Sequence, residues 1–140
     1  MPGRLGELRW VARLVVEATL VDLVREHGGL LGLRDEHGLE AALARPRQRL
    51  AYTPEADVCE LAAVYGHGLA ASHPFHDGNR RIAVVTMVVF LELNGAALAA
   101  TEAEVVTLML ALAAGELDDD GLAAWLRARI TDAGGASGSQ

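Results

Sequence analysis

Lysine is absent from this chain of 140 residues, and cysteine and aromatic residues are scarce. All 12 basic residues are therefore arginine, and 19 acidic residues outweigh them to give a formal net charge of −7. So acidic a chain lacks the basic face that nucleic-acid binding requires, and we expect no direct contact with nucleic acid. The single cysteine, Cys59, excludes a disulfide within the chain, and we expect a buried apolar residue there rather than a catalytic thiol.

Long hydrophobic runs are absent as well. The longest run, residues 82–91, has about half the length that a membrane-spanning helix needs. The first residues lack the apolar stretch of a signal peptide. We therefore expect a cytoplasmic protein that makes no contact with a membrane.

Small and aliphatic side chains dominate what is present. Hydrophobic residues make up 51 % of the chain, mainly alanine, leucine and valine, whereas aromatic residues make up 4 %. Such a composition favours closely packed helices over sheets, and the length suits a single domain. We predict an all-α domain over residues 1–132, followed by a disordered tail of small and polar residues at 133–140.

Apolar periodicity and capping residues predict six helices. They cover residues 8–26, 36–44, a segment ending near 72, 80–93, 102–113 and 122–130. The second should be capped by Asp35 and ended by Pro46, and the fourth should be capped by Asn79. The fourth helix is rich in valine, but it is too long for a strand. It is so apolar that we expect it to be central and almost fully buried.

Two connections are less regular. The third helix begins either after Thr53 and Pro54 or at a capping box formed by Asp57 and Glu60. Residues 28–35 contain too many glycines for a helix and too many apolar side chains for an ordinary solvent-exposed loop. We predict a short extended flap or hairpin there.

Residues 73–79 form a loop that enters a helix N-terminus, where free backbone N–H groups can bind an anion. Gly78 lets a ligand approach the backbone closely, and Asn79 can cap the helix and offer its side-chain amide outward. Arg80 and Arg81 in the first helical turn oppose the helix dipole, so they are poor stabilisers unless a phosphate binds beside them. The segment therefore predicts a phosphate site.

Two further side chains of the loop add reactive chemistry. Asp77 offers a carboxylate oxygen, and Mg²⁺ binds such oxygens together with those of phosphates. His73 offers an imidazole, a group that titrates near neutral pH and can act as a general base. A base, a metal ligand and an anion site lie within one short segment and form the components of a phosphoryl-transfer site.

The same segment resembles the signature of the Fic/Doc superfamily. That signature is histidine, any residue, phenylalanine, any residue, an acid, a small residue, asparagine, a variable position and arginine. The chain reads His73-Pro74-Phe75-His76-Asp77-Gly78-Asn79-Arg80-Arg81. Residues 28–35 and 90–95 are similar to the short death-on-curing (Doc) branch, and so is the total length. The resemblance covers residues 8–130 and implies a compact bundle of about six helices with a small flap and a buried central motif helix.

The resemblance implies roles for individual residues. His73 matches the base that deprotonates a target hydroxyl, and Asp77 matches the acid that holds Mg²⁺ on the phosphates of ATP. Phe75 matches the aromatic residue that anchors the loop in the core. The nucleotide-binding positions are Gly78, Asn79, Arg80 and Arg81. The flap that aligns the backbone of the target comprises Leu30, Leu31, Gly32, Leu33, Arg34 and Asp35.

Two positions separate this chain from the adenylyl-transferring Fic enzymes. Those enzymes carry glycine at the position of Arg80 and a second arginine at that of Val84. Doc proteins carry lysine at the position of Arg80 and are associated with transfer of the γ-phosphate. A bulky cation at Arg80 resembles the Doc pattern, although arginine is larger and planar. The resemblance therefore implies a protein kinase, with adenylyl (AMP) transfer as the alternative.

The resemblance also implies partners. Many Fic proteins carry an inhibitory helix with serine or threonine, three residues, glutamate and then glycine or asparagine, and this sequence holds no such pattern. We therefore expect inhibition by a separate small antitoxin whose C-terminal segment folds as a helix over the toxin. The expected function is that of the toxin in a toxin–antitoxin pair, with elongation factor Tu as the first candidate for the target protein.

Two other functions compete with this interpretation. His76 and Asp77 form the adjacent pair of an HD-type metal phosphohydrolase, but such a centre leaves Phe75, Asn79 and Arg81 without a role. It would also need a histidine before the pair (His27, His37, His67 or His73) and an aspartate after it (Asp118, Asp119, Asp120 or Asp132). The second is a catalytically inactive module that only binds an antitoxin, and the intact motif argues against it.

Overall fold

The computed structural model describes residues 8–132, and within them the chain forms six α-helices and one two-stranded antiparallel sheet. The helices are α1 (Arg13–His27), α2 (Glu36–Tyr52), α3 (Val58–Ser72), α4 (Asn79–Leu93), α5 (Glu102–Ala113) and α6 (Asp119–Arg127). The strands are β1 (Ala96–Leu98) and β2 (Ile130–Asp132). The prediction of an all-α fold is confirmed, and the predicted tail at 133–140 lies outside the described residues.

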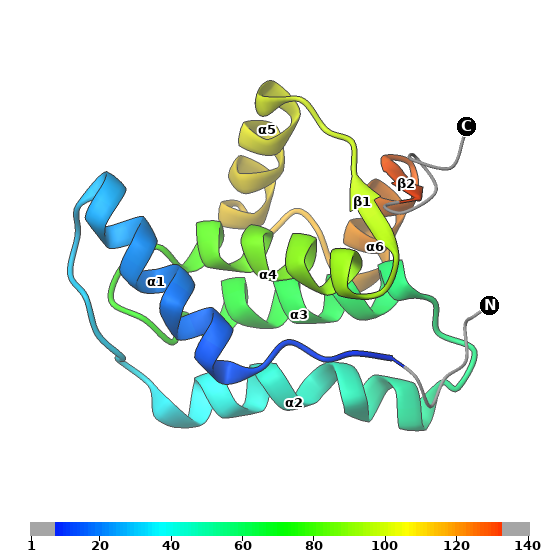
Figure 1. The fold of residues 1–140 in the computed structure, drawn as a ribbon, viewed down its shortest axis with the longest axis horizontal. Coiled ribbons are helices and arrows are strands. Elements are labelled where there is room, and N and C mark those ends of the chain that lie inside the picture. Colours follow the sequence, from blue (N-terminus) through cyan, green and yellow to red (C-terminus); the bar gives the residue numbers. More distant parts are fainter. Residues whose placement is uncertain (1–7, 133–140) are drawn as a thin grey trace.

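The core lies around α3, which packs against α2, α4 and α6. In Figure 1, α2, α3 and α4 run side by side, while α1 crosses them at an angle and α5 stands above α4. Residues 82–91 of α4 include no exposed side chain, as expected for a central motif helix. The buried face of α3 carries Tyr65, whose ring lies 5.2 Å from that of Phe90 in α4.

Cys59 lies in the first turn of α3 and is 1 % exposed. Burial raises the pKa of its thiol to about 11, so the thiol stays protonated and unreactive at neutral pH. The prediction of a buried apolar residue is confirmed. Within residues 8–132, none of the helices is both long and apolar enough to cross a bilayer.

The first helix starts at Arg13, and the predicted start at residue 8 is wrong. Tertiary contacts hold the preceding segment extended. The N–H of Val11 donates to the hydroxyl of Tyr65 at 3.0 Å. The N–H of Arg9 donates to the side-chain oxygen of Asn94 at 2.9 Å, and the amide nitrogen of Asn94 donates back to the Arg9 carbonyl at 2.9 Å. These groups replace the helical hydrogen bonds that the apolar pattern predicted.

The second helix continues through Pro46, so the predicted end at residue 44 is wrong. A proline inside a helix removes one backbone hydrogen bond and costs about 3 kcal/mol. Here the residues around it are tied to another helix, because Arg45 and Arg49 bind Asp119 of α6 at 3.0 and 2.7 Å. Pro46 itself is buried. Tertiary contacts therefore outweigh the local break.

The boundaries of the third and last helices are set by aspartates. Asp57 accepts a hydrogen bond from the N–H of Glu60 at 2.8 Å, so α3 starts at the second of the two predicted positions. Asp118 caps α6, which therefore spans 119–127 instead of the predicted 122–130. Residues 130–132 pair with β1 as a strand, a sheet too short to leave a periodic signal in the sequence.

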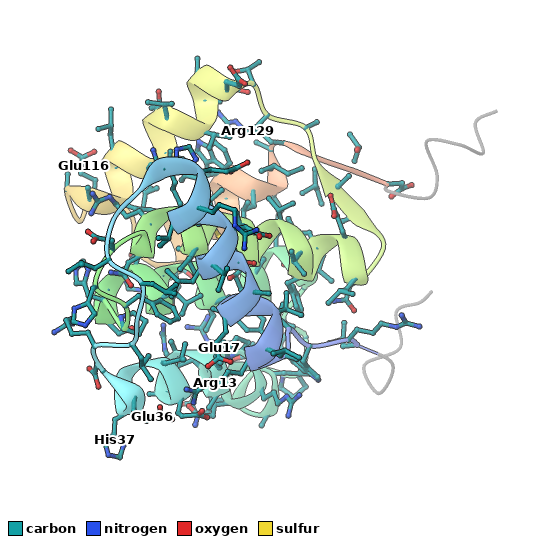
Figure 2. The ribbon with its side chains drawn as sticks, turned by 60° about the vertical axis from the view of Figure 1, so that its left-hand side comes forward. Arg13, Glu17, Glu36, His37, Glu116 and Arg129 are labelled. Atoms are coloured by element: carbon teal, nitrogen blue, oxygen red, sulfur yellow. The ribbon has the colours of Figure 1, made fainter. Side chains whose placement is uncertain are left out.

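Arg13 joins the start of α1 to the start of α2. Figure 2 shows it beside Glu17 and Glu36. Its guanidinium binds Glu17 at 2.9 Å and Glu36 at 2.5 Å, and it also contacts Glu40. The flap at residues 28–35 connects the end of α1 to the start of α2. The ion pairs of Arg13 therefore join the two ends of the segment that consists of α1 and the flap.

Candidate functional site

The loop between α3 and α4 begins and ends on a residue in the left-handed region. His73 has φ 48° and ψ 56°, and Gly78 has φ 82° and ψ 9°. A Cβ on Gly78 would lie within 4 Å of no other atom of the structure, so glycine is needed there for its backbone angle rather than for space. At His73 the left-handed conformation costs roughly 1–2 kcal/mol. The structure must therefore supply contacts that hold it.

Asn79 braces the loop from within. Its side-chain nitrogen donates to the carbonyl of Phe75 at 2.8 Å, and its side-chain oxygen accepts from the N–H of Phe75 at 3.0 Å. Phe75 is 2 % exposed, in agreement with an anchoring role in the core. The prediction that Asn79 caps α4 and offers its amide outward is wrong, because Gly78 is the N-cap and the amide turns back onto the loop.

The N-terminus of α4 is left open. No side chain caps it, and its first turn contains no acidic residue. The N–H groups of Asn79, Arg80 and Arg81 consequently lack helical partners, and the side chains of Arg80 and Arg81 are exposed. Partial positive charge from the helix and two full charges thus meet at one place, which suits an anion carrying several negative charges.

The flap packs against this loop in an extended conformation. Leu33 and Phe75 form an antiparallel bridge, in which the N–H of Arg34 donates to the carbonyl of Pro74 at 2.7 Å and the N–H of His76 donates to that of Gly32 at 3.3 Å. Of the two predicted forms, the extended flap is therefore confirmed. It pairs with the motif loop and does not fold back on itself as a hairpin.

Asp77 is held by the start of the flap. Its Oδ2 accepts a hydrogen bond from the N–H of Leu30 at 2.7 Å. A Cβ on Gly29, which has φ +108°, would lie 3.1 Å from the Cβ of Asp77, so both the angle and the space call for glycine. At the start of the flap, the side chains of Leu30 and Leu31 are 65 % and 58 % exposed. At its end, Asp35 caps α2.

A cavity of about 640 Å³ brings the predicted residues together. Its lining includes His73, Asp77, Gly78, Asn79, Arg80 and Arg81. A second cavity of about 230 Å³ adjoins it and shares His73 and Arg80. The larger volume lies within the usual range for small-molecule sites, roughly 300–1,000 Å³. These motif residues thus line one pocket that is open to solvent and has room for a nucleotide.

The rest of the cavity lining includes residues that were not predicted from the sequence. Leu23 and Val24 of α1 line it, as do Val106 and Leu110 of α5. Val106 and Leu110 are 50 % and 66 % exposed and lie four residues apart on one helix face. The apolar residues on this exposed face are the signal in the sequence that could have indicated a binding surface. They do not indicate which other segment of the chain lies near that face.

The single carboxylate of the site, that of Asp77, suits a metal that arrives with phosphate oxygens. Among the described residues, no group of three histidine, cysteine, aspartate or glutamate side chains could hold a metal ion. This finding disagrees with the HD-type phosphohydrolase, which needs several such ligands near Asp77. Asp77 is a single exposed carboxylate in the cavity. Mg²⁺ commonly takes one or two carboxylates with substrate phosphates and water, so the residues present fit that metal.

Comparisons with known proteins agree with this geometry. A model of the Fic/DOC family matches residues 10–91, which include the flap, the motif loop and most of α4. The protein kinase doc of Escherichia phage P1 is 33 % identical over 104 residues, which are 74 % of this chain and 82 % of the phage protein. The toxin Doc of Mycolicibacterium smegmatis is 41 % identical over 75 residues, which are 52 % of this chain and 57 % of that protein. The chain therefore belongs to the Fic/DOC family, in its Doc branch.

Proposed function

We propose that this chain is the toxin of a toxin–antitoxin pair and that it transfers the γ-phosphate of ATP to a hydroxyl group of a target protein. One observation carries the proposal: His73, Asp77, Arg80 and Arg81 line a single cavity at the open N-terminus of α4. The names of the two relatives, protein kinase doc and toxin Doc, support it.

In the proposed reaction His73 is the general base. Its imidazole accepts the proton of the target hydroxyl while the hydroxyl oxygen forms a bond to the γ-phosphorus. The bond from that phosphorus to the bridging oxygen breaks, and ADP leaves with the electron pair. Mg²⁺, when bound at Asp77, would neutralise charge on the phosphate oxygens. The proton on His73 then returns to solvent.

Arg80 is the residue that favours γ-phosphate over AMP transfer. It lines both cavities, as His73 does, so its side chain is placed to contact a triphosphate bound beside the proposed base. Arg81 lines only the larger cavity. In-line attack requires the hydroxyl oxygen about 3–3.5 Å from the reacting phosphorus, so a charge that reverses the direction of the triphosphate changes which phosphorus reacts. We propose that Arg80 selects the γ-phosphorus in this way.

The flap offers an edge for the backbone of the target. In its bridge with Phe75, Leu33 is the residue between the two hydrogen bonds, so its own N–H and C=O point away from the loop. Within residues 8–132 neither group has a backbone partner. An extended target segment could pair with this edge by strand addition and bring its hydroxyl to His73. Elongation factor Tu is the first target protein to test.

The apolar wall of the cavity suits the expected antitoxin. Val106 and Leu110 of α5 line the same cavity as Leu23 and Val24 of α1, and a helix with an apolar face could cover all four. Such a helix would also cover His73 and Arg81 below it. We propose that a small antitoxin with a C-terminal helix inhibits the protein by this route.

Parallel labelling tests the reaction type. The protein is incubated with cell lysate, or with purified elongation factor Tu, and with ATP labelled in the γ- or the α-phosphate. We expect the γ-label alone to appear on a protein band. His73→Ala should abolish labelling, whereas His37→Ala should preserve it, because His37 lies on the exposed first turn of α2 and lines neither cavity. Labelling by the α-phosphate would contradict the proposal.

A further inference from the structure

The C-terminus of α3 ends in an unusual way, and the proposed base lies there. The helix ends on His73 in the left-handed conformation, and the next residue is Pro74. A helix that ends on a left-handed residue usually has its last carbonyls capped by the N–H groups that follow. Proline has no N–H, so part of this cap is unavailable. The carbonyl oxygens at the end of α3 therefore need another donor.

Arg34 of the flap supplies it. Its Nε and Nη2 donate to the carbonyl of His73 at 2.9 and 2.5 Å, and Nη2 also donates to the carbonyl of Ser72 at 3.2 Å. The backbone N–H of Arg34 donates to the carbonyl of Pro74 at 2.7 Å. One residue thus binds three consecutive carbonyl oxygens, and the central one belongs to His73. Its positive charge also complements the negative end of the helix dipole.

We infer that Arg34 is a positioning residue for His73. This inference rests on the proposed role of His73 as the base. Because the guanidinium binds the carbonyl on one side of the His73 backbone, it holds the φ and ψ angles that direct the imidazole into the cavity. Arg34 acts through the backbone of the base and does not touch the substrate.

The contacts of Arg34 distinguish it from the other arginines near the cavity. Its guanidinium donates hydrogen bonds to the carbonyls of Ser72 and His73. By contrast, Arg80 and Arg81 form no ion pair or side-chain hydrogen bond within residues 8–132. Arg34 also lines neither cavity. A role in phosphate binding is therefore assigned to Arg80 and Arg81, and Arg34 keeps the loop in shape.

The conformation of His73 can be measured without any enzymatic assay. The three-bond coupling between its amide and α protons, together with its backbone chemical shifts, reports the φ angle in isotopically labelled protein. We expect Arg34→Ala to move these values away from those of the wild type and Arg34→Lys to move them less. The control Arg25→Ala removes an exposed arginine whose nearest acid, Asp22, lies 3.6 Å away, and it should leave them unchanged.

Kinetics of phosphate transfer provide the second measurement. A displaced base lowers kcat by about 100-fold, because misplacement by about 1 Å has that effect. KM for ATP should stay at the wild-type value, and methylguanidinium in solution should restore part of the kcat of Arg34→Ala. If His73 gives wild-type couplings and shifts in both Arg34 variants, the inference is wrong even if activity falls. If wild-type protein transfers no phosphate, the proposed function fails, while the magnetic-resonance result still decides whether Arg34 holds His73.

Discussion

Most residues of the motif loop either stabilise the loop or present a functional group to the cavity, and few do both. Phe75 and Asn79 hold the loop to itself and to the core. His73, Arg80 and Arg81 are exposed in the cavity. Asp77 belongs to both groups, because its carboxylate accepts from the flap and also faces the cavity. Substitutions at Asp77 can separate the two parts.

Asp77→Asn should abolish Mg²⁺-dependent binding of ATP while it preserves the flap. An asparagine oxygen can still accept from the N–H of Leu30, but a neutral amide is a poor ligand for Mg²⁺. Asp77→Ala should lose both interactions and about 1 kcal/mol of stability, the usual net value of one hydrogen bond. Titration calorimetry with and without Mg²⁺ measures binding, and thermal unfolding measures stability. Unchanged Mg²⁺-dependent binding in Asp77→Asn would remove the metal role.

The residue types of the site were recognisable from the sequence, but their hydrogen-bond partners were not. The spacing from His73 to Arg81 predicted a base, an acid and two cations, and the structure places these four side chains in the lining of one cavity. The direction of the Asn79 amide depends on the backbone of Phe75 being turned toward it. The role of Arg34 likewise depends on how the flap meets the end of α3. Such contacts arise only when distant segments pack.

At the scale of helices and strands, capping side chains predicted the helix boundaries better than the helix-breaking residue Pro46 did. Asp35 and Asp57 cap α2 and α3 as local chemistry predicts. Pro46 does not end α2, because partly buried ion pairs of Arg45 and Arg49 hold the helix on both sides of it. The short strands β1 and β2 escaped prediction because their pairing is set by tertiary contact. Local signals are reliable where no tertiary contact opposes them.

Asp57 combines a helix cap with an ion pair, and pH separates the two. Burial alone would raise its pKa, but hydrogen bonds from Arg127 and from the N–H of Glu60 outweigh burial and lower it. A carboxylate with a lowered pKa stabilises the fold above its unfolded pKa, near 3.9, and this stabilisation is lost as the pH falls through the lower folded value. The benefit of Asp57 should therefore be full at neutral pH and disappear in acid.

Two substitutions at Asp57 give the magnitudes. Asp57→Asn keeps a good cap and loses the charge, so it should cost less than about 1 kcal/mol at neutral pH, since both partners are about half exposed. Asp57→Ala loses the cap as well and should cost about 1 kcal/mol more. Denaturant unfolding at a series of pH values measures the difference. If the gap between wild type and Asp57→Asn persists in acid strong enough to protonate Asp57 in the folded protein, the ion pair is not its cause.

At the scale of the whole molecule, the site is assembled from segments far apart in the chain. The flap, the motif loop and most of α4 lie within the part that matches the Fic/DOC family, residues 10–91. Helix α5 lies outside that part, yet its Val106 and Leu110 line the same cavity as the motif residues. The family match thus covers the proposed chemistry, while the surface proposed for the antitoxin depends partly on residues beyond it.

In the proposed reaction, Arg80 orients the triphosphate and thereby selects the γ-phosphate for transfer. Arg80→Gly removes a positively charged side chain from the lining of both cavities and should weaken phosphate transfer. It should not produce an efficient adenylyl transferase, because Val84 stands where those enzymes carry a second arginine. Loss of phosphate transfer in Arg80→Gly with unchanged binding of ATP would agree with a role in orienting the triphosphate. Wild-type transfer in this variant would remove that role.

The most direct measurement is the mass of the modified target. The wild-type protein is incubated with ATP, Mg²⁺ and its labelled target from lysate or with elongation factor Tu, and the intact target and its peptides are analysed by mass spectrometry. We expect an increase equal to one phosphate group on a serine, threonine or tyrosine, and no such increase with His73→Ala. An increase equal to one AMP group, produced by the wild-type protein, would contradict it.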